Sequence, residues 1–177
     1  MQYIYEFDLT VKEYSQRGKN NQFPEFNSCP ICNAQKSLDK HGFYPRNALL
    51  IKRDYRIPIR RYYCSSCGRT VSILPSFLLP YYQYSLSVIM RCLKQVLTRK
   101  KKNISYYRQL GEHYKKRYLN NIPGMLSFFR DTFSPLLAFP SDVHKKTIKL
   151  LEMIDSSPEE TFAKRYFNHF QTSFMAI

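Results

Sequence analysis

The chain has 177 residues, enough for one ordinary domain or two small ones and too few for a large multidomain enzyme. Hydrophobic residues make up 44% and aromatic residues 16% of the sequence, which excludes a disordered composition and predicts a packed core. The formal net charge of +15 makes polyanions the first class of partner to consider.

The first ten residues predict no targeting segment. They contain Glu6 and Asp8 and no apolar run, unlike a signal peptide or a transit peptide. No stretch of the sequence approaches the roughly 20 apolar residues that a membrane span needs. We therefore expect a cytoplasmic protein with no membrane partner. In such a reducing compartment, paired Cys-x-x-Cys motifs favour metal sites over disulfides.

The first half of the chain has strand-like patterns. A short strand is expected over residues 3 to 9, and a turn-rich linker over residues 15 to 28. Residues 43 to 74 alternate in the manner of a small antiparallel sheet. Within them, Pro58 indicates an edge strand, because proline lacks an amide donor for a second neighbour.

The second half of the chain has helical patterns. From Ser85 the apolar period lengthens to about 3.6 residues, which predicts a helix that runs into a basic connector at residues 99 to 102. Further helices are expected over 105 to 116, over 121 to 133 with Phe129 and Phe133 inward, and over 141 to 155. A last helix is expected from Ser157, where Ser-Pro-Glu-Glu forms a capping box.

These patterns predict an α+β fold. Its parts are a four-cysteine zinc ribbon with a small antiparallel sheet and an α-helical, helix-turn-helix-like bundle. The expected domains are an N-terminal strand and linker (1–28), the zinc ribbon (29–80), a basic helical unit (81–140) and C-terminal helices (141–177).

Two Cys-x-x-Cys motifs predict one metal centre. Two residues between cysteines let both thiolates converge on one ion, and two such pairs complete a closed, structural Zn²⁺ shell. The 31 residues between the pairs are enough for a β-hairpin. A redox disulfide pair and an iron-sulfur cluster are the alternatives. His41 is expected to be a surface residue. Cys92 is expected to be a core or boundary residue. The four expected ligands are Cys29, Cys32, Cys64 and Cys67.

The positive charge is concentrated in the middle of the chain. Residues 29 to 140 carry twenty basic and four acidic side chains, whereas the segments on either side are nearly balanced. A local excess of this kind favours binding to the phosphates of nucleic acid, although a solvated surface that maintains solubility would also be basic. The candidate nucleic-acid contacts are Lys52, Arg53, Arg56, Arg60, Arg61, Arg69, Lys100, Lys101, Lys102, Asn120, Asn121 and Arg130.

Three of these candidates depend on a helix-turn-helix interpretation of the helices that follow the ribbon. In that motif the last helix enters the major groove by its N-terminal residues, so Asn120, Asn121 and Arg130 would contact bases and phosphates. Any small basic three-helix bundle would have a similar pattern. The expected connector over residues 115 to 119 is also longer than a tight turn.

Four motifs occur in a suggestive order: Cys29-Pro30-Ile31-Cys32, residues 41–46 (HGFYPR), residues 57–64 (IPIRRYYC), and Cys67-Gly68-Arg69-Thr70. Together they resemble the zinc ribbons of bacterial insertion-sequence transposases and of short mobile-element proteins, over residues 29 to about 133. The resemblance implies a module that recognises element ends or assists a transposase, with the four cysteines as ligands and Arg60, Arg61 and Arg69 as DNA contacts. Such transposases carry a carboxylate triad on a separate domain, for which this chain has no room, so we expect no enzyme.

The sequence thus favours a zinc-dependent, DNA-binding accessory or regulatory protein of a mobile element. Its expected partners are duplex DNA and a transposase or other nucleic-acid enzyme, with a homodimer favoured if the target is palindromic. Two alternatives stay open. One is an RNA-binding zinc-ribbon module. The other is a protein-interaction subunit of a larger enzyme complex, with residues 141 to 177 as the contact surface.

Overall fold

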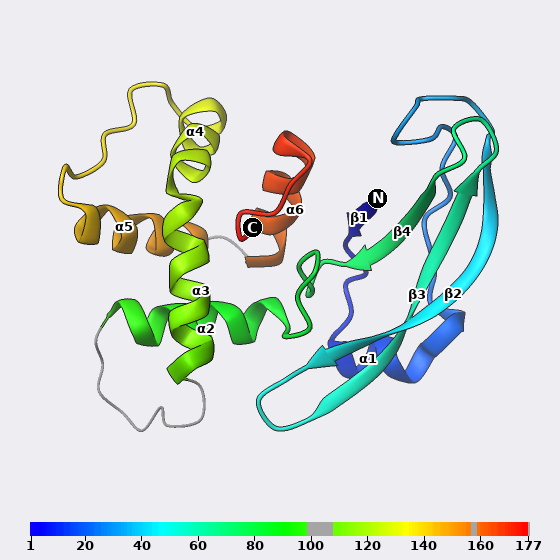
Figure 1. The fold of residues 1–177 in the computed structure, drawn as a ribbon, viewed down its shortest axis with the longest axis horizontal. Coiled ribbons are helices and arrows are strands. Elements are labelled where there is room, and N and C mark those ends of the chain that lie inside the picture. Colours follow the sequence, from blue (N-terminus) through cyan, green and yellow to red (C-terminus); the bar gives the residue numbers. More distant parts are fainter. Residues whose placement is uncertain (99–107, 157–158, 177) are drawn as a thin grey trace. The chain divides into compact units, whose positions relative to one another are not determined.

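The computed structural model describes residues 1–98, 108–156 and 159–176. It divides into two compact units, which we call the N-terminal unit (Met1–Ser85) and the C-terminal unit (Leu86–Ile177). The first is built on a sheet and the second on helices (Figure 1), so the predicted α+β class is confirmed. Within the described ranges, no helix combines the length and the apolar character that crossing a membrane requires.

A four-stranded sheet forms the N-terminal unit. Its order is β1-β4-β3-β2, with β2 antiparallel to β3, β3 antiparallel to β4, and β1 parallel to β4. The three strands of the predicted ribbon, β2 to β4, are antiparallel to one another, as expected, whereas the parallel addition of the N-terminal strand to this sheet was not predicted. The strands are β1 (Gln2–Tyr5), β2 (Leu38–Leu49), β3 (Asp54–Cys64) and β4 (Thr70–Pro75).

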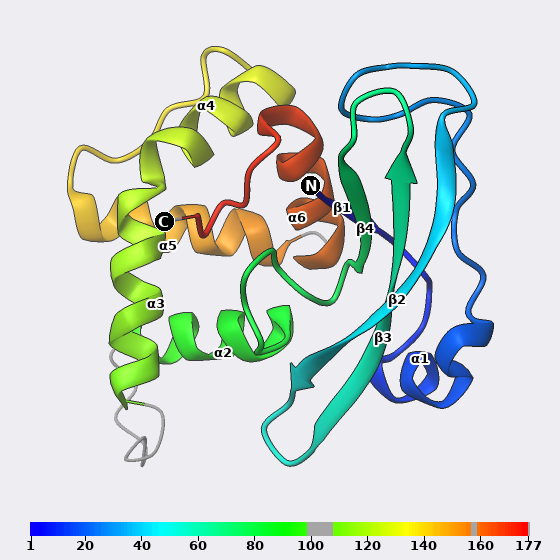
Figure 2. The ribbon, with the colours of Figure 1, turned by 45° about the vertical axis from the view of Figure 1, so that its right-hand side comes forward.

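Strands β2 and β3 form a long hairpin (Figure 2). Along β3, Ile57 and Ile59 are buried on one face and Tyr62 and Cys64 on the other, since successive side chains point to opposite faces. Strand β3 is interior, so the prediction that Pro58 marks an edge strand was wrong. Pro58 is tolerated because β4 pairs only with residues 61 to 63, and the missing amide is not needed there.

A helix that the sequence patterns did not predict covers part of the expected linker. Helix α1 (Val11–Arg17) begins at a capping box in which Thr10 and Glu13 bind each other's backbone amides, and the 3-10 helix η1 (Gly18–Asn20) follows. Tyr14 of α1 is buried and donates a hydrogen bond to the carbonyl of Pro58 (3.0 Å). Residues 15 to 20 are therefore not a linker but part of a helical segment that packs on β3.

The C-terminal unit contains the predicted helices. Three predicted features lie wholly or partly outside the described part of the chain. They are the basic connector at 99 to 102, the start of the expected helix at 105 to 107, and the capping box at 157 to 160. The expected connector over 115 to 119 was wrong, because the helix there continues to Asn120 and one residue separates it from the next helix. The helices are α2 (Leu86–Leu97), α3 (Arg108–Asn120), α4 (Ile122–Thr132), α5 (Val143–Asp155) and α6 (Glu159–Phe170).

Aromatic side chains fill the core between α4 and α6. Phe128, Phe129, Phe162 and Tyr166 pack ring to ring in edge-to-face, tilted and stacked pairs, with centroids 5.4–5.8 Å apart. The sequence pattern placed Phe133 in this core instead of Phe128. Phe133 is 63% exposed because α4 ends at Thr132, so the apolar stripe of the helix does not extend to it.

Helices α2 and α3 approach closely at Gly111. A β-carbon at this position would lie 2.6 Å from Cγ2 of Val96, and valine in a helix has one strongly preferred rotamer. We expect Gly111→Ala to lower the free energy of unfolding by about 1–3 kcal/mol despite its higher helix propensity. Urea denaturation should show this loss, and adding Val96→Ala should restore part of it. Equal stability of Gly111→Ala and the wild-type chain would contradict the close packing.

Candidate metal centre and nucleic-acid interface

The first cysteine pair lies in a turn before β2. The amide of Cys29 donates to the carbonyl of Ala34 (2.9 Å), and the amide of Asn33 donates to the carbonyl of Cys29 (2.8 Å). The amide of Ile31 points to the sulfur of Cys29, at 3.4 Å. Such amides stabilise the negative charge of a thiolate. The local sequence therefore folds into a knuckle that presents two sulfur atoms in one direction.

The second pair lies where β3 ends. The amide of Cys64 donates to the carbonyl of Arg69, and the amide of Gly68 donates to the carbonyl of Cys64, both at 2.9 Å. Gly68 has a positive φ of 67°, a conformation in which glycine is favoured. The tight turn after Cys67 therefore needs this glycine.

Ser37 links the two knuckles, and the sequence patterns did not identify it as part of the site. Its hydroxyl donates to the carbonyl of Ala34 (2.9 Å) and accepts from the thiol of Cys64 (3.3 Å). Its carbonyl accepts from the amide of Ser65 (3.0 Å). Ser37 is buried, and nothing in the motif spacing identifies it, since its role depends on the pairing of Leu38 with Cys64 across the hairpin.

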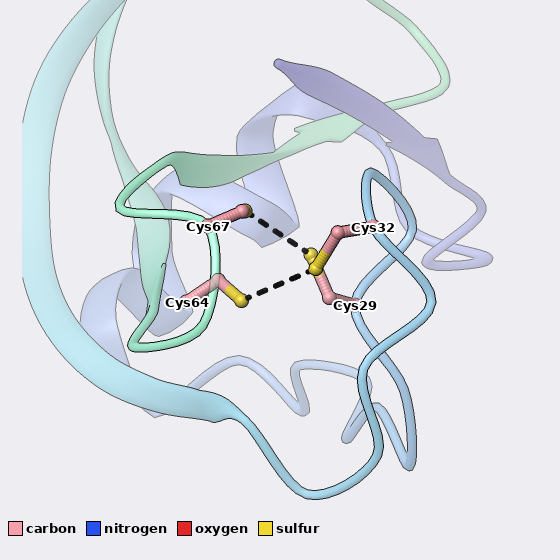
Figure 3. Close-up of side chains that lie close together, drawn as sticks. All are labelled: Cys29, Cys32, Cys64 and Cys67. Atoms are coloured by element: carbon pink, nitrogen blue, oxygen red, sulfur yellow. Dashed lines mark hydrogen bonds between the residues drawn. The ribbon is translucent and has the colours of Figure 1, made fainter.

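The four sulfur atoms converge on one point (Figure 3), and all lie within 4.8 Å of one another. Between the knuckles, Cys29 and Cys67 are 4.0 Å apart and Cys32 and Cys64 are 3.7 Å apart. Four sulfurs at about 2.3 Å from one tetrahedral ion would be separated by roughly 3.8 Å, whereas a disulfide needs about 2.05 Å. The four cysteines are free and lie close enough to hold one metal ion.

Two of the thiols, those of Cys32 and Cys64, have shifted pKa values. The pKa of Cys64 is lowered to about 6, and the largest cause is the hydrogen bond with the hydroxyl of Ser37. This hydroxyl can turn to donate to the thiolate. For Cys32, a hydrogen bond from the backbone of Ala34 acts to lower the pKa, but desolvation and the other three thiols outweigh it and raise the pKa to about 11. Crowded thiols resist ionising together, so a cation at their centre would stabilise the full set of thiolates.

Several predicted nucleic-acid contacts are exposed on the hairpin. Lys52 and Arg53 lie in the loop that joins β2 to β3, Arg56 follows on β3, and Arg69 lies beside the second knuckle. His41, expected to be a surface residue, is exposed and lies against the ring of Tyr63, with centroids 5.6 Å apart. The exposed cations are therefore found at both ends of the hairpin.

Arg60 and Arg61 are held by aromatic rings. The guanidinium of Arg60 lies 4.7 Å from the ring centroid of Phe43 and 5.5 Å from that of Tyr62, and Arg61 lies 5.7 Å from that of Tyr44. The Nε atom of Arg61 is buried and has no hydrogen-bond partner among the described residues. Both side chains are half-buried, so they contribute to the packing of the hairpin as well as to its charge.

The remaining candidates lie in the C-terminal unit or outside the described residues. Asn120 and Arg130 are exposed on α3 and α4, whereas Lys100, Lys101 and Lys102 are not described. The side-chain amide of Asn121 donates to the carbonyls of Arg117 and Ala176, both at 2.9 Å, and makes no side-chain cap of α4. The side chain of Asn121 thus connects α3 to the C-terminal segment.

The candidate site consists of two cysteine knuckles at one end of the β2–β3 hairpin. Residues 29–109 match a family model described as a domain of unknown function (DUF6431). The match begins at the first cysteine of the cluster, includes all four cysteines, and extends through α2. No curated protein and no solved structure matches the chain.

Proposed function

We propose that this chain is a zinc-containing nucleic-acid-binding protein whose N-terminal unit binds duplex DNA. The observation that carries the proposal is the convergence of four cysteine sulfurs at the base of a hairpin with exposed cations. A tetrahedral set of four thiolates is typical of zinc, and it leaves no position for a substrate or a water molecule. The metal would therefore have a structural role.

The hairpin has dimensions that suit a DNA groove. Strand β2 has twelve residues, and the eleven steps between them, at about 3.3 Å each, give a contour length of roughly 36 Å. This is close to the length of one turn of duplex DNA, and the major groove admits a two-stranded β-ribbon. Cations at both ends of the hairpin could contact phosphates on either side of the groove.

We assign the C-terminal unit a secondary role in DNA binding, through Asn120 and Arg130. Both are exposed on consecutive helices, as the helix-turn-helix interpretation requires. The single residue between α3 and α4 departs from the three- to four-residue turn of that motif. The hairpin is therefore the primary contact in this proposal.

The biological setting that we propose is a mobile element. The order of motifs resembles that of transposase zinc ribbons. A metal bound by all four cysteines would have no open coordination position for a substrate. An accessory or regulatory protein that binds element ends in the cytoplasm, or that assists a transposase without cutting DNA, fits both observations.

The first test is binding of the zinc-loaded chain to duplex DNA, single-stranded DNA and structured RNA over a salt series. We expect duplex DNA to bind most tightly, with the logarithm of the association constant falling linearly as the logarithm of the salt concentration rises. A preference for RNA would favour the RNA-binding alternative. Weak binding to every nucleic acid, with a slope near zero, would contradict the proposal and favour a protein partner.

A further inference from the structure

A polar hollow lies along β2, away from the cysteine cluster. It has a volume of about 600 Å³ and is open to solvent. Tyr44, which lines it, is six residues from the metal-proximal end of β2, or roughly 20 Å along the strand. No acidic residue is found among the described residues that line it, which are Gln2, Tyr44, Pro45, Arg46, Asn47, Arg56, Tyr81 and Gln83.

Tyr81 is held at this hollow by an unfavourable turn. The amide of Tyr82 donates to the carbonyl of Leu79 (3.1 Å), so Pro80 and Tyr81 are the central residues of a β-turn. Tyr81 has a φ of +68°, a value that favours glycine or asparagine at this position of the turn. Its side chain is nevertheless large and aromatic, and the residue is 84% exposed. Neither the turn nor the core accounts for an exposed tyrosine ring at this position.

Arg46 supplies positive charge at the base of the hollow. Its guanidinium donates to the side-chain oxygen of Gln2 (3.2 Å) and to the carbonyls of Leu79 (3.0 Å) and Tyr82 (2.9 Å). All three partners are uncharged, so no carboxylate neutralises this half-buried cation in the described part of the chain. Burial lowers the pKa of Arg46, and the nearby phenol of Tyr44 opposes the shift. Arg46 also fixes both ends of the turn that carries Tyr81.

We propose that this hollow binds one unpaired nucleotide of a nucleic-acid strand, with its base stacked on Tyr81 and its phosphate attracted by Arg46 and Arg56. The inference rests on the proposed function, because the ligand is part of a nucleic acid. It adds that a single-stranded nucleotide, and not the duplex alone, is recognised.

The chemistry of the hollow matches the two halves of a nucleotide. An exposed ring can stack on any base, and arginine binds phosphate oxygens through its planar fork of donors. Asn47 and Gln83 offer amide groups that can both donate and accept hydrogen bonds at the edge of a base. Because the hollow is open, the strand could continue in both directions.

The test compares a blunt duplex with the same duplex carrying a short single-stranded overhang that contains 2-aminopurine. We expect the overhang to increase affinity about tenfold and the probe fluorescence to be quenched by stacking. The chain has no tryptophan, so the probe can be excited without a tryptophan background. Tyr81→Gly should abolish both effects and leave the binding of the blunt duplex unchanged, whereas Tyr81→Phe should keep both.

Two controls separate binding from folding. Glycine is favoured at a positive φ, so Tyr81→Gly should not lower the unfolding temperature. Phe133→Ala, which removes an exposed ring from the C-terminal unit, should leave overhang binding and quenching unchanged.

The possible outcomes distinguish this inference from the proposed function. If the blunt duplex binds but the overhang adds no affinity, or if Tyr81→Gly retains quenching, the inference is wrong and the proposed function stands. If the blunt duplex does not bind but a single strand is quenched in a Tyr81-dependent way, the duplex proposal fails and this inference stands. Competition by a mononucleotide as strong as competition by the strand would overturn the assignment to a nucleic-acid strand.

Discussion

Replacing Cys64 by serine is expected to remove the metal and unfold the cysteine end of the hairpin. Structural zinc contributes about 10–16 kcal/mol in small zinc domains, comparable to the entire stability of a typical domain of about 5–15 kcal/mol. Phe26, Ile31 and Leu38 pack on the core cluster beside the knuckles, so this packing should be lost as well. Zinc analysis should show one ion per wild-type chain and none in the variant, and NMR spectra should lose the dispersed amide signals of the sheet.

The fifth cysteine provides the matched control. Cys92 is buried in α2, outside the metal cluster, so Cys92→Ala should retain one zinc ion and the sheet signals of the N-terminal unit. The helices of the C-terminal unit have their own aromatic core, and their circular dichroism should persist in Cys64→Ser. A folded Cys64→Ser chain without metal would show that the sulfur cluster is not a structural metal site.

The second large effect is expected when the exposed cations at the tip of the hairpin are removed. Changing Lys52, Arg53 and Arg56 to glutamine should reduce affinity for duplex DNA by about 100-fold, if each phosphate contact contributes about 1 kcal/mol. The slope of log K against log[salt] should become less negative by about 2.7, since each contact contributes about 0.9. Fluorescence anisotropy with a labelled blunt duplex over a salt series measures both quantities.

A control with the same change in net charge tests whether position matters. Lys12, Arg17 and Lys19 are exposed in the α1–η1 segment of the same unit, and changing all three to glutamine should alter affinity and slope much less. Equal losses in the two triple variants would mean that net charge alone attracts DNA. No loss at the hairpin tip would exclude the hairpin from the interface.

Local patterns predicted much of the secondary structure. The apolar period from Ser85 identified α2, and the alternation around Ile57 and Ile59 identified β3. Helix α1 was missed, because it has only seven residues and one fully buried side chain, Tyr14, which is too little for a periodic pattern. The parallel pairing of β1 with β4 depends on partners about 70 residues apart, and no local pattern carries that information.

The cysteine cluster was easier to predict than the basic surface. Cysteine spacing reflects a geometric constraint, since two knuckles can surround one ion only if their sulfurs converge, and the structure brings all four within 4.8 Å of one another. A basic residue in a sequence has no such constraint. Arg46 donates to two backbone carbonyls, and Arg61 is half-buried against the ring of Tyr44, because their surroundings are supplied by residues distant in the sequence.

The parallel pairing of β1 also determines the order in which the N-terminal unit can be completed. Gln2 pairs beside Ser72, and Tyr5 beside Pro75, so β1 is synthesised before its partner strand and must wait until nearly the whole unit has been made. The β2–β3 hairpin and both cysteine pairs emerge earlier, and a metal that joined Cys29 to Cys67 would shorten the chain that β1 must close. Capture of the metal would therefore precede and favour the last strand pairing of the sheet.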